Sequence, residues 1–287
     1  MSTMNNLKTF VLMAGLFGLL LLAGQMLGGT QGLLLMGGLG LLMNFGMYFF
    51  SDTMVLKMYG AQKVTEAEAP ELYRMVDRLR RRAGLPMPVV AVTPAEQPNA
   101  FATGRSPEKA VVAVTTGILK YMPQDELEGV IAHELAHIKN RDMLISTIAA
   151  GIAGLLSNLP YILMFGRRDD EEGGHPVLML ALAVLAPLGA MILQFAVSRQ
   201  REFEADRVGA MILGRPMPLA NALRRLETMA MRIPMNVSPA AAPLAQVNPL
   251  RGGGGMLALF STHPPTEQRV AALEALANDP SFRALPA

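Results

Sequence analysis

Four long apolar stretches constrain this chain more than any other feature of its sequence. A helix needs about 20 mostly apolar residues to cross a bilayer, and such stretches are difficult to place in a soluble domain. The chain is 51% hydrophobic and only 17% charged, whereas an average soluble domain has about 25% charged residues. The stretches cover residues 10–27, 33–50, 144–165 and 176–197.

We therefore expect four transmembrane helices in two hairpins. The sequence GGTQG separates the first two stretches closely enough for a tight turn. The first stretch could instead be a cleaved signal peptide, but a second span follows at once without an A-x-A-like site, so we interpret it as a retained anchor. The third stretch is weaker because polar residues and a proline interrupt it, and its alternative is a buried or interfacial helix.

The distribution of Lys and Arg predicts the orientation in the membrane. Twelve of these residues lie in 51–142 and ten lie in 198–287, whereas the loop between the third and fourth stretches has only Arg167 and Arg168. Positive residues mark the cytoplasmic side. We expect a multi-pass protein of the cell inner membrane, with both termini in the cytoplasm; the two loop arginines mildly oppose this orientation.

The segments outside the membrane predict one α+β domain in two parts. The division is 1–50 (first hairpin), 51–143 (first part of the domain), 144–197 (second hairpin) and 198–287 (second part). The β-branched runs PVVAVT and AVVAVT are typical of strands, and residues 233–260, rich in Pro and Gly, predict a loop without an assigned role. The expected helices cover 66–82, 123–142, 198–213 and 266–278, and the expected strands cover 88–93, 99–104 and 110–115.

The sequence HELAH at 133–137 carries the chemistry. Residues four apart share a helix face, so His133 and His137 can bind one Zn²⁺. Glu134 lies beside that position, where it can take a proton from the attacking water and pass it to the leaving amine. The alternative is a chance match. However, two of only four histidines fall on an otherwise apolar helix, where they are costly to bury without a partner.

A catalytic zinc takes three protein ligands and keeps one open position. The chain has no cysteine, and Asn140 and Met143 stand where a metzincin extension needs glycine and histidine. Glu202 and Asp206 share a face of a predicted helix, so one can bind zinc while the other orients a ligand imidazole. The residues alone leave open the alternative of a solvated acidic surface.

HELAH followed by NRD, then REFEAD and STHPPTEQR, resembles the HtpX-type membrane metalloproteases. These are related to the CAAX prenyl proteases and the mitochondrial Oma-type proteases, and the resemblance covers nearly the whole chain except for the unusual segment 233–260. It implies one Zn²⁺ per subunit, Glu202 as third ligand and Asp206 as supporting acid, and we assign Asn140 to the same supporting shell. It also implies a cytoplasmic zincin-like domain that degrades damaged or misassembled membrane proteins.

Two further sites are candidates. Zinc endopeptidases commonly bind an extended peptide against an edge strand, and NAFATG matches the family's element, although it could be an ordinary hairpin strand. His263 precedes two prolines that stiffen the backbone; it could approach the open metal position, bond the oxyanion, or only cap the last helix. We count it as a catalytic candidate. The substrate-binding candidates are Asn99, Ala100, Phe101 and Ala102.

The sequence thus predicts a mainly α membrane protein with a zinc endopeptidase domain carrying a small β-sheet. Its expected partners are the lipid bilayer, unfolded and membrane-protein substrates, and itself through self-cleavage; a net charge of +2 gives no case for nucleic acid. The runner-up function is a CAAX-type prenyl-peptide protease. A non-enzymatic metal transporter or sensor would place its ligands inside the spans, and a silent scaffold would not need Glu134.

Overall fold

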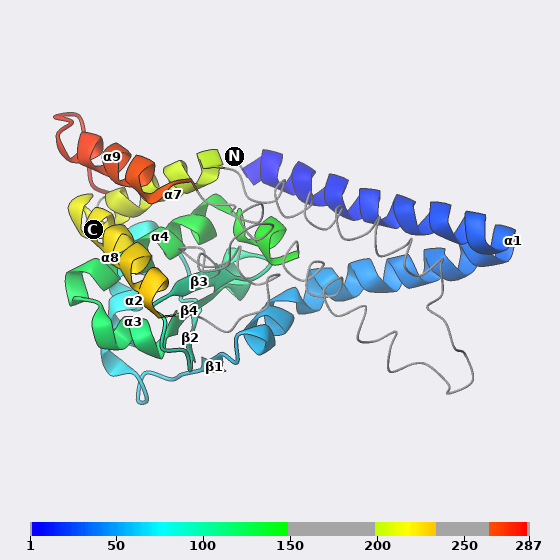
Figure 1. Ribbon diagram of the computed structural model, residues 1–287, viewed down its shortest axis with the longest axis horizontal. Helices are drawn as coiled ribbons and strands as arrows, with labels where there is room; N and C mark the ends of the chain where they lie inside the picture. The colour runs from blue at the N-terminus through cyan, green and yellow to red at the C-terminus, as the bar shows by residue number, and fades with distance from the viewer. Residues whose placement is uncertain (1, 149–198, 234–263, 286–287) are drawn as a thin grey trace.

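The computed structural model describes residues 2–148, 199–233 and 264–285. Most of the third apolar stretch, the whole fourth stretch, the Pro/Gly-rich segment from residue 234 onward and His263 lie outside these residues. Within them the chain is mostly helical with a small mixed sheet. Figure 1 shows helix α1 (Ser2–Met58) projecting as a long hairpin from a body that holds the sheet and the other helices.

The elements follow one another closely in that body. The helices are α2 (Pro70–Ala83), α3 (Thr116–Tyr121), α4 (Gln124–Asn140), α7 (Arg199–Leu213), α8 (Met217–Arg232) and α9 (Thr266–Ala277), with one 3-10 turn, η1 (Pro107–Lys109). The strands are β1 (Gln62–Lys63), β2 (Val89–Thr93), β3 (Ala100–Thr103) and β4 (Val111–Thr115).

Two glycines make the turn of the α1 hairpin. Gly28 and Gly29 leave helical geometry, and Gly29 has a φ of 55°, a conformation that favours glycine. The two arms then touch, because a Cβ added to Gly24 would collide with the carbonyl oxygen of Gly32. The expected tight turn is therefore confirmed. The second arm stays helical past residue 50 as far as Met58, so the predicted domain boundary at 50 falls inside a helix.

One helical segment of the described chain is long and apolar enough to cross a membrane. It is Gly28–Phe50, with 23 residues and a mean hydropathy of 1.7, and it corresponds to the second predicted span. The first arm contains a shorter apolar helix, Met13–Leu22. The expected set of four transmembrane helices is thus not confirmed, since the third and fourth stretches fall largely or wholly outside the described residues.

The sheet is built around two identical pentapeptides. Strands β2 and β4 both read VVAVT and pair in parallel, residue against like residue, from Val89 opposite Val111 to Thr93 opposite Thr115. The strand order is β1-β2-β4-β3, so β3 runs antiparallel to β4 and forms one edge. β-Branched side chains suit such a pleated surface. The expectation that residues 99–104 contain an edge strand is confirmed.

The sheet lies between helices on its two faces. On one face Val90 and Val112 pack with α2 and α4, where Ile131 is fully buried. On the other face Phe101 packs against the end of α1, and its ring lies 4.3 Å from that of Tyr59, centroid to centroid. Helix α1 therefore ends directly under the sheet, and α4 lies on the opposite face.

Two glycines allow α4 to be enclosed tightly. A Cβ on Gly209 of α7 would lie 3.0 Å from the Cα atom of His133, and a Cβ on Gly129 of α4 would lie 2.8 Å from the Cα atom of Leu219 on α8. Helix α9 packs in turn on α7 and α8. Most of α4 is consequently buried, and the polar side chains of His133 and Glu134 are shielded from water.

The expected elements of the body are present with small differences at their ends. Helix α4 stops at Asn140 because Arg141 takes a left-handed conformation with a φ of 56°. Helix α8 was not predicted, although its sequence shows helical spacing in Leu219, Leu223 and Leu226, which are all buried. That omission matters for the fold, since α8 covers one side of α4.

Candidate metal centre

Helix α4 brings its two histidines together inside the body. His133 is 1% exposed and His137 lies one turn further along. Their Nε2 atoms are 2.9 Å apart, with the rings edge to face. The predicted helix and its i, i+4 pair are therefore present, and both imidazoles point one nitrogen at a common position.

Helix α7 supplies a carboxylate to the same position. The Glu202 oxygens lie 3.6 Å from His137 Nε2 and 3.8 Å from His133 Nε2. In a tetrahedral site with metal–ligand distances of about 2.0–2.2 Å, ligand atoms are roughly 3.3–3.5 Å apart. The three atoms of this chain all lie within 4.8 Å of one another, so they could hold one metal ion.

A carboxylate and a guanidinium hold His133 from behind. Asp206 Oδ1 lies 2.9 Å from Nδ1 of His133. Arg269 of α9 donates to both oxygens of Asp206, from Nε at 2.8 Å and from Nη2 at 2.6 Å. Its Nη1 is also 3.5 Å from Glu202. Asp206 thus lies where the sequence analysis expected an orienting acid, whereas Arg269 had been given no role.

A second carboxylate holds His137. Asp142 Oδ1 lies 3.1 Å from Nδ1 of His137. The left-handed turn at Arg141 brings Asp142 back, and its backbone N–H donates to the His137 carbonyl at 3.3 Å. Asp142 ends the NRD string that contributed to the resemblance, in which only Asn140 was predicted to support the centre. The supporting role of Asn140 stays a prediction.

The charges around the histidines change their acid–base properties. Burial lowers the pKa of His137, but the negative charges of Asp142, Glu202 and Glu134 outweigh it and raise the pKa from 6.5 to about 10. Burial raises the pKa of Asp206, yet the adjacent Arg269 guanidinium brings it below its ordinary value. The carboxylates around the histidines thus favour a positive charge between them.

Charge balance favours a divalent cation at this position. Two buried guanidinium groups face four buried carboxylates, so these six groups carry a net charge of −2 when they are ionised. Buried charges are costly unless they are paired or bound to metal. Two imidazoles and a carboxylate are also a usual ligand set for catalytic zinc. The four buried carboxylates belong to Glu134, Asp142, Glu202 and Asp206, and the two buried guanidinium groups belong to Arg201 and Arg269.

The edge strand lies beside this centre. The backbone N–H of Thr115 donates to the carbonyl of Asn99 at 2.9 Å, and because antiparallel residues face their partner alternately, the N–H and C=O of Ala102 point away from β4. The side chain of Asn99 accepts the N–H of Ala100 at 2.9 Å. All four β3 residues are buried, so a peptide must displace what covers this edge before it can bind there.

The fold and the ligand set together define a metallopeptidase, with a glutamate inside a histidine pair on a buried helix beside a small mixed sheet. The chain belongs to peptidase family M48, whose sequence profile matches residues 66–277. A curated relative from Gemmatimonas aurantiaca, called "Protease HtpX homolog", is 62% identical over 278 residues, covering 96% of this chain and 100% of that one. One of the same name from Salinibacter ruber is 52% identical over 276 residues, covering 96% and 99%.

These relatives confirm the resemblance to HtpX-type proteases, and with the apolar helix they identify a membrane metalloprotease. Among solved structures, S. mikatae Ste24p is similar with a TM-score of 0.51 and 19% identity. That match covers 95% of this chain but only 65% of the Ste24p chain, so this chain spans about two-thirds of the neighbour's length. At this identity the likeness concerns the fold alone.

Proposed function

We propose that this chain is a zinc-dependent endopeptidase that cleaves misfolded or damaged membrane proteins at the cytoplasmic face. The observation that carries the proposal is the convergence of three ligand atoms within 4.8 Å. His133, His137 and Glu202 would hold the zinc ion, and Asp206 would orient the imidazole of His133. A zinc ion at this position would supply Lewis-acid chemistry for peptide hydrolysis.

Glu134 performs the proton transfers of hydrolysis. Its side chain is 3% exposed and comes from the same helix as both histidines. It takes the proton of the attacking water as the water adds to the peptide carbonyl carbon, and delivers it to the leaving amine nitrogen. Because the surroundings are dry, that proton is passed between Glu134 and the substrate rather than lost to solvent.

The β3 edge holds the substrate in an extended conformation. Ala102 offers an N–H and a C=O on the side away from β4, and main-chain bonds of this kind are independent of the substrate's side chains. Asn99, Ala100 and Phe101 keep this strand in register. Such recognition suits a quality-control protease, which must accept many sequences once they are unfolded. His263 is proposed to act at the open metal position or on the oxyanion.

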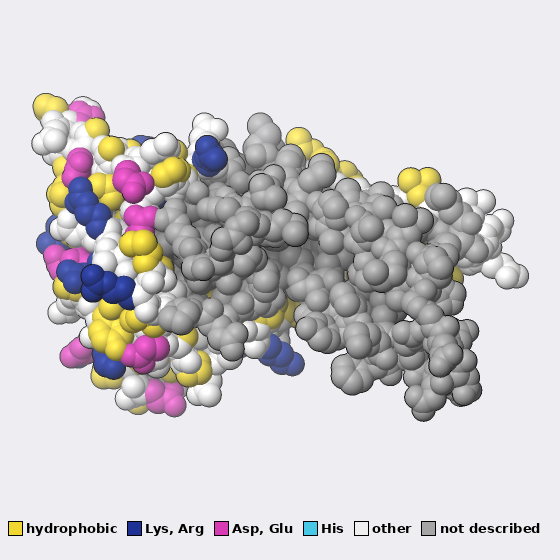
Figure 2. All heavy atoms as spheres, in the orientation of Figure 1, with side chains coloured by type: hydrophobic (Ala, Val, Ile, Leu, Met, Phe, Trp, Pro, Cys, Tyr) yellow, Lys and Arg dark blue, Asp and Glu magenta, His cyan; other side chains and the backbone are white. Residues whose placement is uncertain are grey.

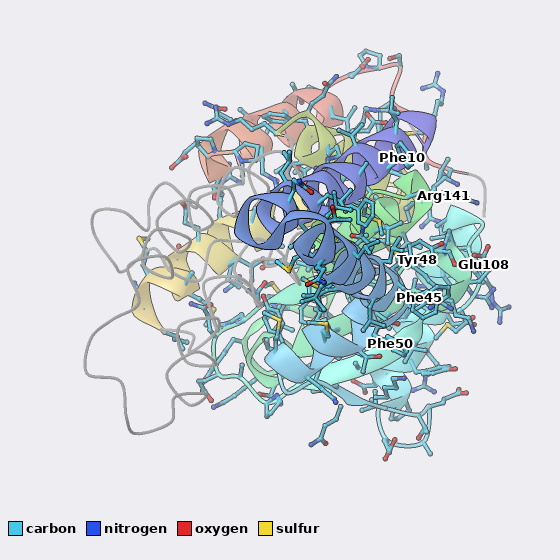
Figure 3. The ribbon with its side chains drawn as sticks, turned by 90° about the vertical axis from the view of Figure 1, so that its right-hand side faces the viewer. Phe10, Phe45, Tyr48, Phe50, Glu108 and Arg141 are labelled. Carbon is cyan, nitrogen blue, oxygen red and sulfur yellow. The ribbon has the colours of Figure 1, made fainter. Side chains whose placement is uncertain are left out.

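The end of α1 supports a membrane location near this strand. Phe45 and Phe50 are 56% and 57% exposed, and Figure 3 shows them with Tyr48 on the α1 hairpin. Aromatic side chains gather where spans meet the interface. Arg105, two residues after β3, donates from Nη1 to the Phe49 carbonyl at 3.1 Å. A segment leaving the bilayer would thus emerge close to the proposed peptide-binding edge.

The orientation follows from the Lys and Arg distribution, with both parts of the domain in the cytoplasm and the chain crossing the membrane four times. Figure 2 shows charged side chains gathered at the end of the molecule formed by α8 and α9, whereas the visible side chains along α1 are mostly uncharged. Reporter fusions after residue 60 and at the C-terminus should report cytoplasm. A fusion near residue 173 should report the outside; a cytoplasmic signal there would refute the four-span arrangement.

The function is tested with the full chain in detergent. The protein is purified with a chelator, zinc is added back, and cleavage of an unfolded membrane protein and of the chain itself is followed. Zinc should restore both activities in the parent protein. It should restore neither activity in the His133→Ala variant or in the His137→Ala variant. Restored cleavage in the histidine variants would show that the protease activity does not depend on this centre.

A further inference from the structure

The two halves of the metal centre are supported differently. In the His133 half, Asp206 lies against the imidazole, and both oxygens of Asp206 accept hydrogen bonds from Arg269. The supporting acid is therefore fully hydrogen-bonded. Acids that orient ligand histidines are themselves usually hydrogen-bonded, and the outer partner contributes to metal affinity. A ligand histidine is therefore fully supported when a carboxylate holds it and a guanidinium group holds that carboxylate.

The His137 half also contains an acid and a guanidinium group, but no hydrogen bond joins them. Asp142 Oδ1 lies 3.1 Å from the imidazole, while its Oδ2 is buried without a hydrogen-bond partner in the part of the chain that the structure describes. Arg201 of α7 is 6% exposed, and its Nη1 and Nη2 atoms likewise have no hydrogen-bond partner there. One carboxylate oxygen of Asp142 and the two Nη atoms of Arg201 are thus buried without a hydrogen bond in the same half of the site.

The two groups interact electrostatically. Burial lowers the pKa of Arg201, and the charge of Asp142 opposes this lowering ahead of that of Glu202. No ion pair within 4 Å is described between Arg201 and Asp142. The other buried side-chain oxygens without a partner in the described ranges, on Thr93 and Gln97, are uncharged. Asp142 Oδ2 is therefore the acceptor that best matches the Arg201 guanidinium.

We propose that Arg201 is a positioning residue of the metal centre, which pairs with Asp142 when the metal binds and so holds His137 as Arg269 and Asp206 hold His133. The proposal rests on the metal centre described above. Helices α4 and α7, which carry the two groups or lie next to them, are already packed together. Leaving Asp142 Oδ2 and the Arg201 Nη atoms buried without hydrogen bonds costs more than pairing them.

A different role for Arg201 is direct binding of the substrate's carbonyl oxygen. The burial of both Nη atoms argues against it, because a substrate cannot reach an enclosed group without a larger rearrangement. The two roles also differ in what they change. A substrate contact acts on KM and leaves zinc affinity alone, whereas a positioning residue acts on zinc affinity even when no substrate is present.

The test is a double-mutant cycle read out as zinc affinity, measured by competition with a chromophoric chelator. Arg201→Ala and Asp142→Ala should each weaken zinc binding about 10–100-fold. The double variant should be no weaker than the weaker single variant, because both remove the same interaction. Arg201→Lys, which keeps the charge, should recover part of the loss. Arg207→Ala is the matched control, since Arg207 lies on the same helix but pairs with Glu204 at the surface, where it is 51% exposed.

The outcomes separate cleanly. Zinc affinity unchanged in Arg201→Ala, or losses that multiply in the double variant, overturns the pairing; a rise in KM alone assigns Arg201 to the substrate. Thermal unfolding of the metal-free variants identifies any that do not fold, and Arg201→Lys then carries the test. If the parent protein binds zinc no better than His133→Ala, the metal centre itself fails, which is a result distinct from failure of the Arg201–Asp142 pair.

Discussion

The α1 hairpin and the interior around α4 both reverse the usual placement of side chains, in opposite directions. On α1, Leu34, Leu35 and Leu42 are 69%, 73% and 68% exposed, whereas at the metal centre Asp206 and Arg269 are each 1% exposed. Large exposed apolar surfaces mark contact with lipid or protein, and fully buried charges require partners. The exposed leucines of the hairpin are therefore stable only in contact with lipid or protein. The buried charges of the body are stable only when opposite charges balance them.

The sharpest test of the charged interior is Glu134→Gln. The amide keeps the shape of the side chain but cannot accept the proton of the attacking water, so kcat should fall about 10²–10⁴-fold. Zinc content should be retained, since Glu134 is not among the three converging ligands. Glu128→Gln is the control on the same helix, because Glu128 pairs with the half-exposed Arg78. Activity within tenfold of the parent would contradict the assignment.

Removing Arg269 should destabilise the fold itself. Arg269→Ala leaves Asp206 buried without its counterion, and loss of one partner of a buried pair costs about 3–5 kcal/mol. Arg224→Ala removes another link between α9 and the body, to Glu274, but both side chains are more than 40% exposed, so less than about 1 kcal/mol is expected. Urea unfolding of the two metal-free variants makes the comparison. Equal losses would mean that α9 is held by general packing.

Substitutions at two glycines allow a direct comparison of the interior around α4 with the α1 hairpin. A Cβ on Gly209 would press on the backbone of His133, whereas a Cβ on Gly38 of α1 would meet nothing within 4 Å. Gly209→Ala should therefore cost about 1–3 kcal/mol through overpacking and weaken zinc binding by moving α7. Gly38→Ala should be neutral or slightly stabilising, since alanine is the better helix former. Unfolding curves and zinc titrations of both variants test this, and a harmless Gly209→Ala would contradict the close packing.

Zinc binding should also depend on pH. Zinc must displace the proton of His137, whose pKa is raised to about 10, so zinc affinity should rise about tenfold per pH unit below that value. Metal-free stability should change in the opposite sense. The raised pKa stabilises the fold fully below about pH 6.5, and this contribution is lost as the pH rises towards 10. Chelator competition and unfolding between pH 6.5 and 8.5 check both directions; zinc affinity independent of pH would remove His137 as a ligand.

Local patterns made much of this molecule predictable. The spacing of HELAH placed both histidines on one face of a helix, GGTQG contained the turn of the hairpin, and two copies of VVAVT became paired strands. Each of these signals lies within a few residues and rests on backbone geometry or side-chain period. Helix α8 shows that a signal can be present and still be passed over, since its leucines have helical spacing.

What the sequence by itself determined is the class of chemistry, through the histidine pair with Glu134 and the acids one turn apart on α7, and an apolar N-terminal helix that suits a membrane. Only the tertiary structure decided how the centre is completed. Arg269 reaches Asp206 across 63 residues and His133 across 136, and Asp142 returns to His137 through a left-handed turn at a non-glycine residue. Such contacts leave no period in the sequence, because they arise where helices pack and where buried charge must be balanced.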